Sequence, residues 1–201
     1  MKVKKNSFNR TFPLFQSHLD LAHDLWTKVL ASGGWAIDAT CGNGHDTLFL
    51  SKHIQDGCGL IGLDLQIGAI QSTQTRLEQN EAPMESIHLF CQSHAEFPSI
   101  AFEHPIQLIV YNLGYLPGGD KSLTTLKSST EASVLQGLNL LAPGGVMSLT
   151  CYPGHPEGLK EEEALLELAR GLSPETWSVT FHQWKNRTSS PSLLLIQKNT
   201  L

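Results

Sequence analysis

Segments typical of strands alternate with helical patterns along almost the whole chain, and this alternation limits the fold more than any other feature of the sequence. The strand-like segments are 35–40, "GLIGLDL", "SIHLFC", "IQLIVYN" and "VMSLTCY". The helical patterns lie at 14–30, behind the glycine loop "CGNGHDT", and at 67–80, 124–141 and 157–172. Strands that alternate with helices form a parallel sheet covered on both faces. The sequence therefore predicts an α/β fold with a doubly wound, Rossmann-like sheet.

The last two strand-like segments, "WSVTFHQW" and "SLLLIQK", are joined only by the polar segment 185–191. A parallel crossover needs about a dozen residues or more, so this pair is expected to be antiparallel. We predict seven strands with the last one reversed. Pro143-Gly144-Gly145 should stop the helix at 124–141 before the fifth strand begins. The 201 residues suffice for one domain, predicted at 14–201 behind a flexible basic tail at 1–13.

Charge and hydropathy narrow the class of partner. The formal net charge is −5, which disfavours a protein that coats nucleic acid with a broad basic face. An enzyme that grips one RNA feature through a local patch stays open, and the basic tail could contact phosphates or remain solvated. No apolar run approaches the length of about 18 residues needed for a membrane span, and no signal-like segment follows the basic tail. We expect a cytoplasmic protein without a membrane partner, and leave open a homodimer.

A metal site is not expected from the cysteines and histidines. The four cysteines form no C-x-x-C pair, and a reducing compartment suits them best. Among the nine histidines, His18 and His23 are five residues apart rather than four, which is not the spacing of a helical zinc pair.

The glycine loop and the end of the second strand predict a nucleoside-binding site. Ligands of such sheets lie at the carboxyl ends of the strands. Gly42 and Gly44 let the backbone approach a ligand, and the helix that follows them begins with free N–H groups. Asp64 ends the second strand, 22 residues after Gly42, where a carboxylate can accept both ribose hydroxyls of an adenosine.

Two cofactor classes use this layout, and the loop favours one of them. Thr47 stands where the dinucleotide motif needs a third small residue. The carboxylates of Asp38 and Asp46 would repel a pyrophosphate but favour the sulfonium and amino groups of S-adenosylmethionine. Asp46 could also serve as a helix N-terminal carboxylate. The reversed last strand is typical of methyltransferases, so we predict S-adenosylmethionine, with a dinucleotide-dependent oxidoreductase as an alternative.

The fourth strand ends in "NLGYLPGGDK", which resembles the [N/D/S]-P-P-[Y/F] motif of amino-group methyltransferases with both prolines replaced. The side-chain carbonyl of Asn112 can accept N–H groups of an amine and so aim its lone pair at a methyl group. Tyr115 can stack on a base. A turn-forming Asn112 and a loop-packing Tyr115 are the alternatives.

The loop "YPGHPEG" after the fifth strand brings Tyr152 and His155 to the same sheet edge. A primary alkylamine is largely protonated at neutral pH, so some group must accept a proton before the amine can attack. His155 and Asp120 are the candidate bases. A His155 that hydrogen-bonds to the backbone is the equal alternative.

Together, "DATCGNGHDT", "GLDLQ", "NLGYLPGGDK" and "YPGHPEG" resemble the MnmM (YtqB) family, once labelled rRNA methylases, over about residues 18–198. The resemblance implies a class I methyltransferase that uses S-adenosylmethionine. It would act on the anticodon region of tRNA, methylating the aminomethyl nitrogen of wobble 5-aminomethyl-2-thiouridine to give the 5-methylaminomethyl form. Methylation of rRNA or of a small-molecule amine is the alternative, and a non-catalytic cofactor-binding protein is a further one.

Position in the motifs assigns the candidate residues. The predicted catalytic or substrate-facing residues are Asn112, Tyr115, Asp120, Tyr152 and His155. The predicted cofactor-binding residues are Asp38, Thr40, Gly42, Asn43, Gly44, Asp46, Thr47, Asp64, Leu65, Gln66, Ser93, His94, Asn112 and Leu113. Two departures from the family pattern are Cys41, where Met is common, and Asn186 followed by Pro191-Ser192 in place of an Asn…Pro-Pro loop.

Overall fold

A computed structural model of the chain describes residues 17–114, 125 and 127–201. The predicted basic tail, Tyr115 and Asp120 lie outside the described residues. Within them, no helix is both long and apolar enough to cross a membrane.

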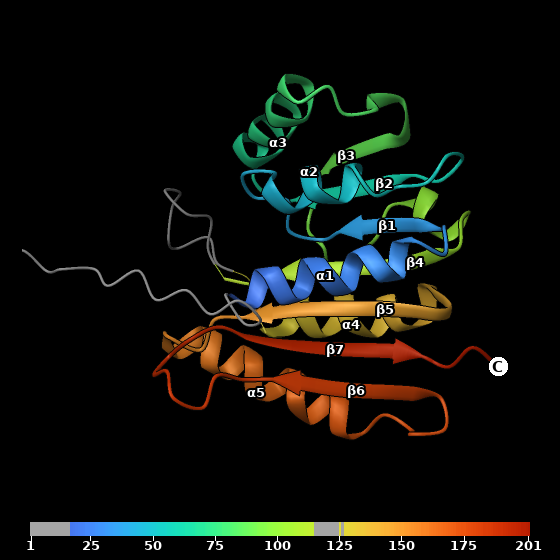
Figure 1. The fold of residues 1–201 in the computed structure, drawn as a ribbon. Coiled ribbons are helices and arrows are strands. Elements are labelled where there is room, and N and C mark those ends of the chain that lie inside the picture. The colour runs from blue at the N-terminus through green and yellow to red at the C-terminus, as the bar shows by residue number, and fades with distance from the viewer. Residues whose placement is uncertain (1–16, 115–124, 126) are drawn as a thin grey trace, which may run out of the picture.

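Seven strands form a single sheet in the order β3-β2-β1-β4-β5-β7-β6 (Figure 1). Their bounds are β1 Trp35–Asp38, β2 Leu60–Asp64, β3 Ile87–Cys91, β4 Ile106–Asn112, β5 Leu141–Cys151, β6 Trp177–His182 and β7 Ser192–Lys198. The pairings among β1 to β5 are parallel, whereas β7 runs antiparallel to both β5 and β6. The predicted α/β sheet with a reversed last strand is therefore confirmed. The reversed strand β7 lies between β5 and β6, so β6 forms one edge of the sheet and β3 forms the other.

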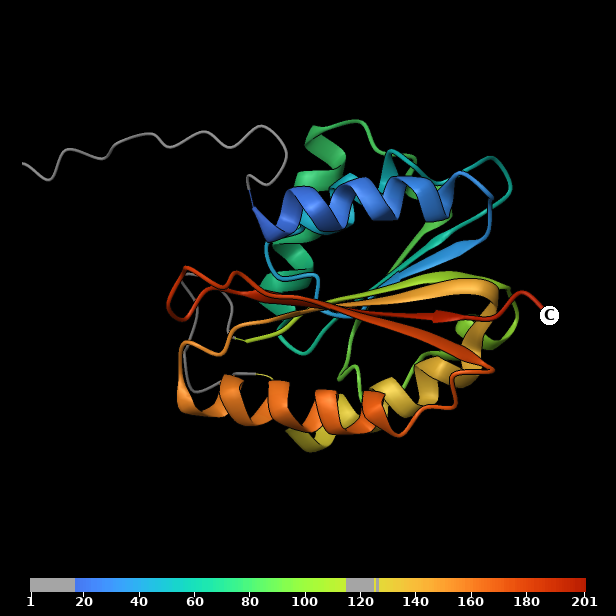
Figure 2. The same ribbon diagram turned by 60° about the horizontal axis from the view of Figure 1, so that its bottom comes forward.

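The described residues form five α-helices that cover the sheet, and Figure 2 shows α1, α2 and α3 on one face and α4 and α5 on the other. Their bounds are α1 His18–Leu30, α2 His45–Ser51, α3 Ile67–Gln79, α4 Lys127–Leu140 and α5 Pro156–Arg170. Alternate side chains of a strand point to opposite faces. Leu108 and Val110 of β4 accordingly pack with α1 to α3, while Ile109 and Tyr111 pack with α4 and α5. Both faces of the central strands are thus buried.

The start of β5 differs from the prediction. The α4 helix ends at Leu140 and β5 begins at once, so Pro143-Gly144-Gly145 lies inside the strand rather than before it. The register explains this, because Ile106 of β4 pairs with Leu141 but Leu108 pairs with Val146. The extra residues of β5 bulge out between these two pairs. A bulge tolerates proline, which has no N–H to donate to the ladder, and Gly144 has a φ of +78° there.

Candidate active site

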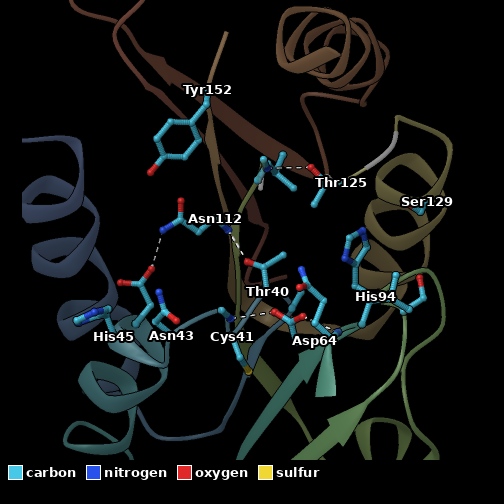
Figure 3. Close-up of a pocket in the computed structure, with 18 of the residues that line it drawn as sticks. Thr40, Cys41, Asn43, His45, Asp64, His94, Asn112, Thr125, Ser129 and Tyr152 are labelled. Atoms are coloured by element: carbon cyan, nitrogen blue, oxygen red, sulfur yellow. Dashed lines mark hydrogen bonds between the residues drawn. The ribbon is translucent and has the colours of Figure 1, made fainter. Parts of the chain in front are cut away.

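A cavity of about 670 Å³ lies at the carboxyl ends of the strands, on either side of the point between β1 and β4 where the strand order reverses (Figure 3). This is the position that the topology of the sheet predicts. Its volume suits a nucleoside-sized ligand. The described residues that line it are Ala39, Thr40, Cys41, Gly42, Asn43, His45, Asp46, Asp64, Leu65, Gln66, Ser93, His94, Asn112, Leu113, Gly114, Thr125, Ser129, Tyr152, Gly154, His155 and Ser189.

The carboxylate of Asp64 is fixed at the end of β2 by two backbone hydrogen bonds. Its Oδ2 accepts the N–H of Gly42 at 2.9 Å, and its Oδ1 accepts the N–H of Gln66 at 2.9 Å. Each carboxylate oxygen can accept more than one hydrogen bond. Asp64 therefore faces the cavity in a fixed orientation with acceptor capacity left for a pair of ligand hydroxyls.

The glycine loop is shaped by contacts with α3. Gly44, with a φ of +75°, caps α2, and a Cβ at this position would lie 2.7 Å from the Cα of Thr73. Arg76 of α3 donates from Nε to the carbonyl of Asn43 at 2.6 Å. Gly44 itself does not line the cavity. Its role is to let the loop sit close to α3, so that Gly42 and Asn43 form the cavity wall.

Asp38 and Thr47 lie behind the cavity wall and do not line it. The Thr47 hydroxyl donates to Oδ2 of Asp38 at 2.6 Å, and the N–H of Thr40 donates to Oδ1 at 3.1 Å. Burial, reinforced by the nearby Asp46 carboxylate, raises the pKa of Asp38 to about 7. These hydrogen bonds fix the carboxyl end of β1 on the side away from the cavity. Asp46 is thus the carboxylate of this pair that faces the cavity.

Asp46 anchors the side chain of Asn112. The Asn112 Nδ2 donates to Oδ2 of Asp46 at 3.0 Å, and Nε2 of His23, on α1, lies 3.0 Å from Oδ1. A carboxylate only accepts hydrogen bonds, so the amide nitrogen of Asn112 must face Asp46. Figure 3 shows the amide oxygen pointing away from that bond, on the Tyr152 side. The Asn112 N–H donates to Oγ1 of Thr40 at 2.7 Å, which ties the ends of β4 and β1 together.

Tyr152, the residue after β5, places its hydroxyl beside the first residue of α1. Nε2 of His18 lies 3.3 Å from the Tyr152 hydroxyl, and the two rings meet edge to face with centroids 5.8 Å apart. Burial is the main reason that the pKa of Tyr152 rises to about 12, and the negative charge of Asp46 adds to it. The hydroxyl therefore keeps its proton at neutral pH.

His155 was predicted either as a base or as a residue that hydrogen-bonds to the backbone, and the structure shows the backbone hydrogen bond. It caps α5, and its Nδ1 accepts the N–H of Gly158 at 3.1 Å. A neutral imidazole has one acceptor nitrogen, so the proton must then reside on Nε2. In this arrangement His155 presents a donor, and the geometry argues against its prediction as a base.

Several cavity residues were missed in the sequence. Thr125 is one of them, and two hydrogen bonds tie it to Gly114 just after β4. The Thr125 N–H donates to the Gly114 carbonyl, and the Gly114 N–H donates to Oγ1 of Thr125, both at 2.9 Å. The same Oγ1 donates to Glu161 of α5 at 2.9 Å. No local pattern marks Thr125. Ser189 could have been found from topology, because β6 runs parallel to β5 and its carboxyl end must meet the same edge. The remaining missed residues are Ala39, Cys41, His45, Gly114, Ser129 and Gly154.

The lining contains two carboxylates, Asp46 and Asp64, and no lysine or arginine among the described residues. In the same part of the chain no group of three or more histidine, cysteine or acidic side chains is arranged to hold a metal ion. The cavity wall therefore suits a cationic ligand with hydroxyl groups better than a pyrophosphate, which would need cationic or N–H partners.

A family model described as "Putative rRNA methylase" matches residues 60–198. The chain belongs to this family. A chloroplast protein of Arabidopsis thaliana named tRNA (mnm(5)s(2)U34)-methyltransferase is 37% identical to this rRNA methylase family member over 187 residues, covering 89% of this chain and 68% of its own. The resemblance found in the sequence motifs is thereby confirmed.

Solved structures of similar proteins share the fold of this family member. A "putative rRNA-methylase" from Clostridium thermocellum superposes with a TM-score of 0.84 at 28% identity, covering 94% of this chain and 100% of that one. A "putative methyltransferase" from Streptococcus mutans, crystallised with S-adenosylhomocysteine, gives a TM-score of 0.76 at 30% identity over 90% of this chain and 97% of its own. The fold is that of a class I methyltransferase.

Proposed function

We propose that the protein is an S-adenosylmethionine-dependent tRNA methyltransferase that acts on the aminomethyl nitrogen of wobble 5-aminomethyl-2-thiouridine. The observation that carries the proposal is the anchored Asn112 amide, whose nitrogen is held by Asp46 at 3.0 Å while its oxygen lies on the Tyr152 side of the cavity (Figure 3). The similarity to the Arabidopsis enzyme, whose name specifies the mnm(5)s(2)U34 position of tRNA, supports this choice of substrate.

The cavity residues fit S-adenosylmethionine. Asp64 offers acceptors for ribose hydroxyls, and Leu65, 65% exposed beside it, offers an apolar wall for the base. Nε2 of His94 is buried in the same lining and has no hydrogen-bond partner within the described chain, so it is available to a polar atom of the ligand. When bound, this cofactor supplies the transferable methyl group on a sulfonium cation, and the carboxylates of the lining favour that charge.

Asn112 and Tyr152 are proposed to hold the amino group of the substrate. The Asn112 oxygen accepts one N–H of the substrate nitrogen, and the Tyr152 hydroxyl oxygen lies on the same side of the cavity to accept another. Two acceptors fix the rotation of an amine about its C–N bond, so its lone pair points in a defined direction. Asp46 contributes indirectly, because it prevents the Asn112 amide from turning its N–H groups toward the amine.

The composition of the loop between β6 and β7 supports RNA as the molecule that contains the substrate amine. Residues 183–191 include Lys185 and Arg187 and no acidic residue, in a chain with a net charge of −5. The Arg187 guanidinium lies 4.1 Å from the centroid of the Trp184 ring. The same loop contributes Ser189 to the cavity. Cations and aromatic rings beside an active site are suited to phosphates and unpaired bases.

A methyl-transfer assay on tRNA from cells lacking this activity, read by nucleoside mass spectrometry, tests the proposal. We expect 5-aminomethyl-2-thiouridine to gain the mass of one CH₂ group when enzyme and S-adenosylmethionine are added. Asn112→Ala, which removes the amide proposed to hold the amine and keeps Asp64 and the glycine loop, is the matched control. Transfer to rRNA or to free amines, with none to this tRNA nucleoside, would refute the substrate assignment and leave the fold unaffected.

Two sequence expectations accompany the proposal. A cytoplasmic location is proposed with the tRNA substrate and is tested by fractionating cells. The homodimer left open in the sequence is tested by the mass of the purified protein in solution.

A further inference from the structure

The half-buried imidazole of His18 is connected to the cavity by the side chain of Tyr152. His18 begins α1, and its Nε2 lies 3.3 Å from the hydroxyl of Tyr152. Tyr152 lines the cavity, whereas His18 does not. The Tyr152 hydroxyl therefore separates the imidazole from any substrate and can hydrogen-bond to both.

The proposed reaction requires a group of this kind. A primary alkylammonium ion and a sulfonium cation give a secondary alkylammonium ion and a thioether, so one proton must leave for each methyl group transferred. That proton must go before the N–C bond forms, because the protonated amine has no lone pair. The ammonium pKa falls in a site that also holds a sulfonium cation, which eases the loss.

The two carboxylates of the cavity and the acceptor nitrogen of His155 already make hydrogen bonds within the chain. Both oxygens of Asp46 are engaged, by Asn112 and His23, and both oxygens of Asp64 accept backbone N–H groups. Nδ1 of His155 accepts the N–H of Gly158. His45 and His94 also line the cavity, but Figure 3 shows them beside Asn43 and Asp64, whereas Tyr152 lies beside Asn112. Among the described groups, the His18 and Tyr152 pair therefore places an imidazole and a hydroxyl on the side where the amine is held.

We propose that His18 accepts the proton that the substrate ammonium must lose, with the Tyr152 hydroxyl passing it between them. The ammonium N–H bond breaks toward the Tyr152 oxygen, while the Tyr152 O–H bond breaks toward Nε2 of His18. The amine lone pair is then free to form the N–C bond, and His18 later releases the proton to water. This inference rests on the proposed function, because it takes an alkylamine as substrate.

The surroundings of His18 favour its neutral form, which can accept a proton. Burial lowers the pKa of His18, against the opposing effects of Asp46 on α2 and Asp20 on its own helix. Within the described residues, the other titratable group in contact with His18 is Tyr152, which stays protonated at neutral pH. The position of His18 in the first turn of α1 also disfavours the imidazolium. A histidine with a pKa below its usual value is neutral at physiological pH and releases a captured proton readily. In the tautomer with its proton on Nδ1, Nε2 is the nitrogen that accepts from the Tyr152 hydroxyl.

The test is a pH profile of single-turnover methyl transfer to tRNA by the wild type, His18→Gln and Tyr152→Phe. The wild-type rate should be nearly constant from neutral to mildly alkaline pH. It should fall only in the acidic range in which His18 becomes protonated, since burial lowers the pKa of His18. Both variants should be about a hundredfold slower near pH 7 and should gain about tenfold per pH unit as hydroxide takes over. The double variant should be no slower than either single one.

Matched measurements separate this role from a structural one. His182→Gln, an exposed histidine of β6, should keep the wild-type profile. Affinity for S-adenosylhomocysteine and the melting temperature should be unchanged in all variants. A rate loss in His18→Gln that is the same at every pH, or losses that add in the double variant, would overturn the proposal. If the wild type itself leaves 5-aminomethyl-2-thiouridine unmethylated, the proposed function fails instead, which is a distinguishable outcome.

Discussion

Replacing Asp46 with alanine should disable the Asn112 amide without touching Asn112 itself. The substitution removes a charged acceptor that lies 3.0 Å from the Asn112 Nδ2. A hydrogen bond to a charged group contributes about 1.5–3 kcal/mol. Without it the amide can rotate and present N–H groups, rather than its oxygen, to the substrate amine. Since about 1.4 kcal/mol corresponds to a factor of ten, we expect the rate of methyl transfer to fall by about ten- to a hundredfold.

The assay is single-turnover methyl transfer at saturating cofactor, compared with calorimetric affinities for S-adenosylmethionine and S-adenosylhomocysteine. If Asp46 acts on Asn112 alone, the rate falls while both affinities stay close to wild type. If Asp46 also faces the sulfonium, the affinity for S-adenosylmethionine falls more than that for the uncharged product. Asp46→Asn, which can still accept from Asn112, should lose less activity than Asp46→Ala. An unchanged rate in Asp46→Ala would refute the anchoring argument.

Three further outcomes are expected. Asn112→Ala should retain cofactor affinity and lose most turnover, since it removes the acceptor for the amine; wild-type turnover would remove Asn112 from the mechanism. Asp64→Ala should raise the dissociation constant of S-adenosylhomocysteine by about ten- to a hundredfold, because it removes a charged acceptor, and unaltered affinity in calorimetry would contradict the ribose assignment. Arg187→Ala should weaken tRNA binding and lower the salt dependence of log K by about one, whereas Lys52→Ala, which removes an exposed cation at the end of α2, should not; equal effects of the two would argue against the β6–β7 loop as an RNA contact.

The fold could be predicted because each strand of the sheet carries its own local signal. Apolar runs such as "IQLIVYN" are buried on both faces, and the short polar link between β6 and β7 requires an antiparallel pair. The start of β5 could not be predicted, because Pro143-Gly144-Gly145 has the composition of a turn and only the pairing with β4 makes it a bulge.

The candidate site was predictable as far as it is built from strand ends. Asp64 and Asn112 end β2 and β4, so topology brings them to one cavity. The partners of these residues were not predictable, because His23 meets Asp46, and His18 meets Tyr152, only through the way α1 packs across the sheet. No motif records such a crossing, since it depends on the packing of residues such as Trp26 against both the sheet and α2.

The place of β7 between β5 and β6 has a consequence for biosynthesis. During synthesis each of β2 to β5 can pair with a strand that has already been made, but one edge of β5 stays open until residues 192–198 have been made. An open edge of buried, apolar residues such as Leu149 is a template for pairing with other chains. Nascent chains that stall or end before β7 should therefore aggregate rather than accumulate as partly active enzyme, and chaperone contact should be concentrated in that interval.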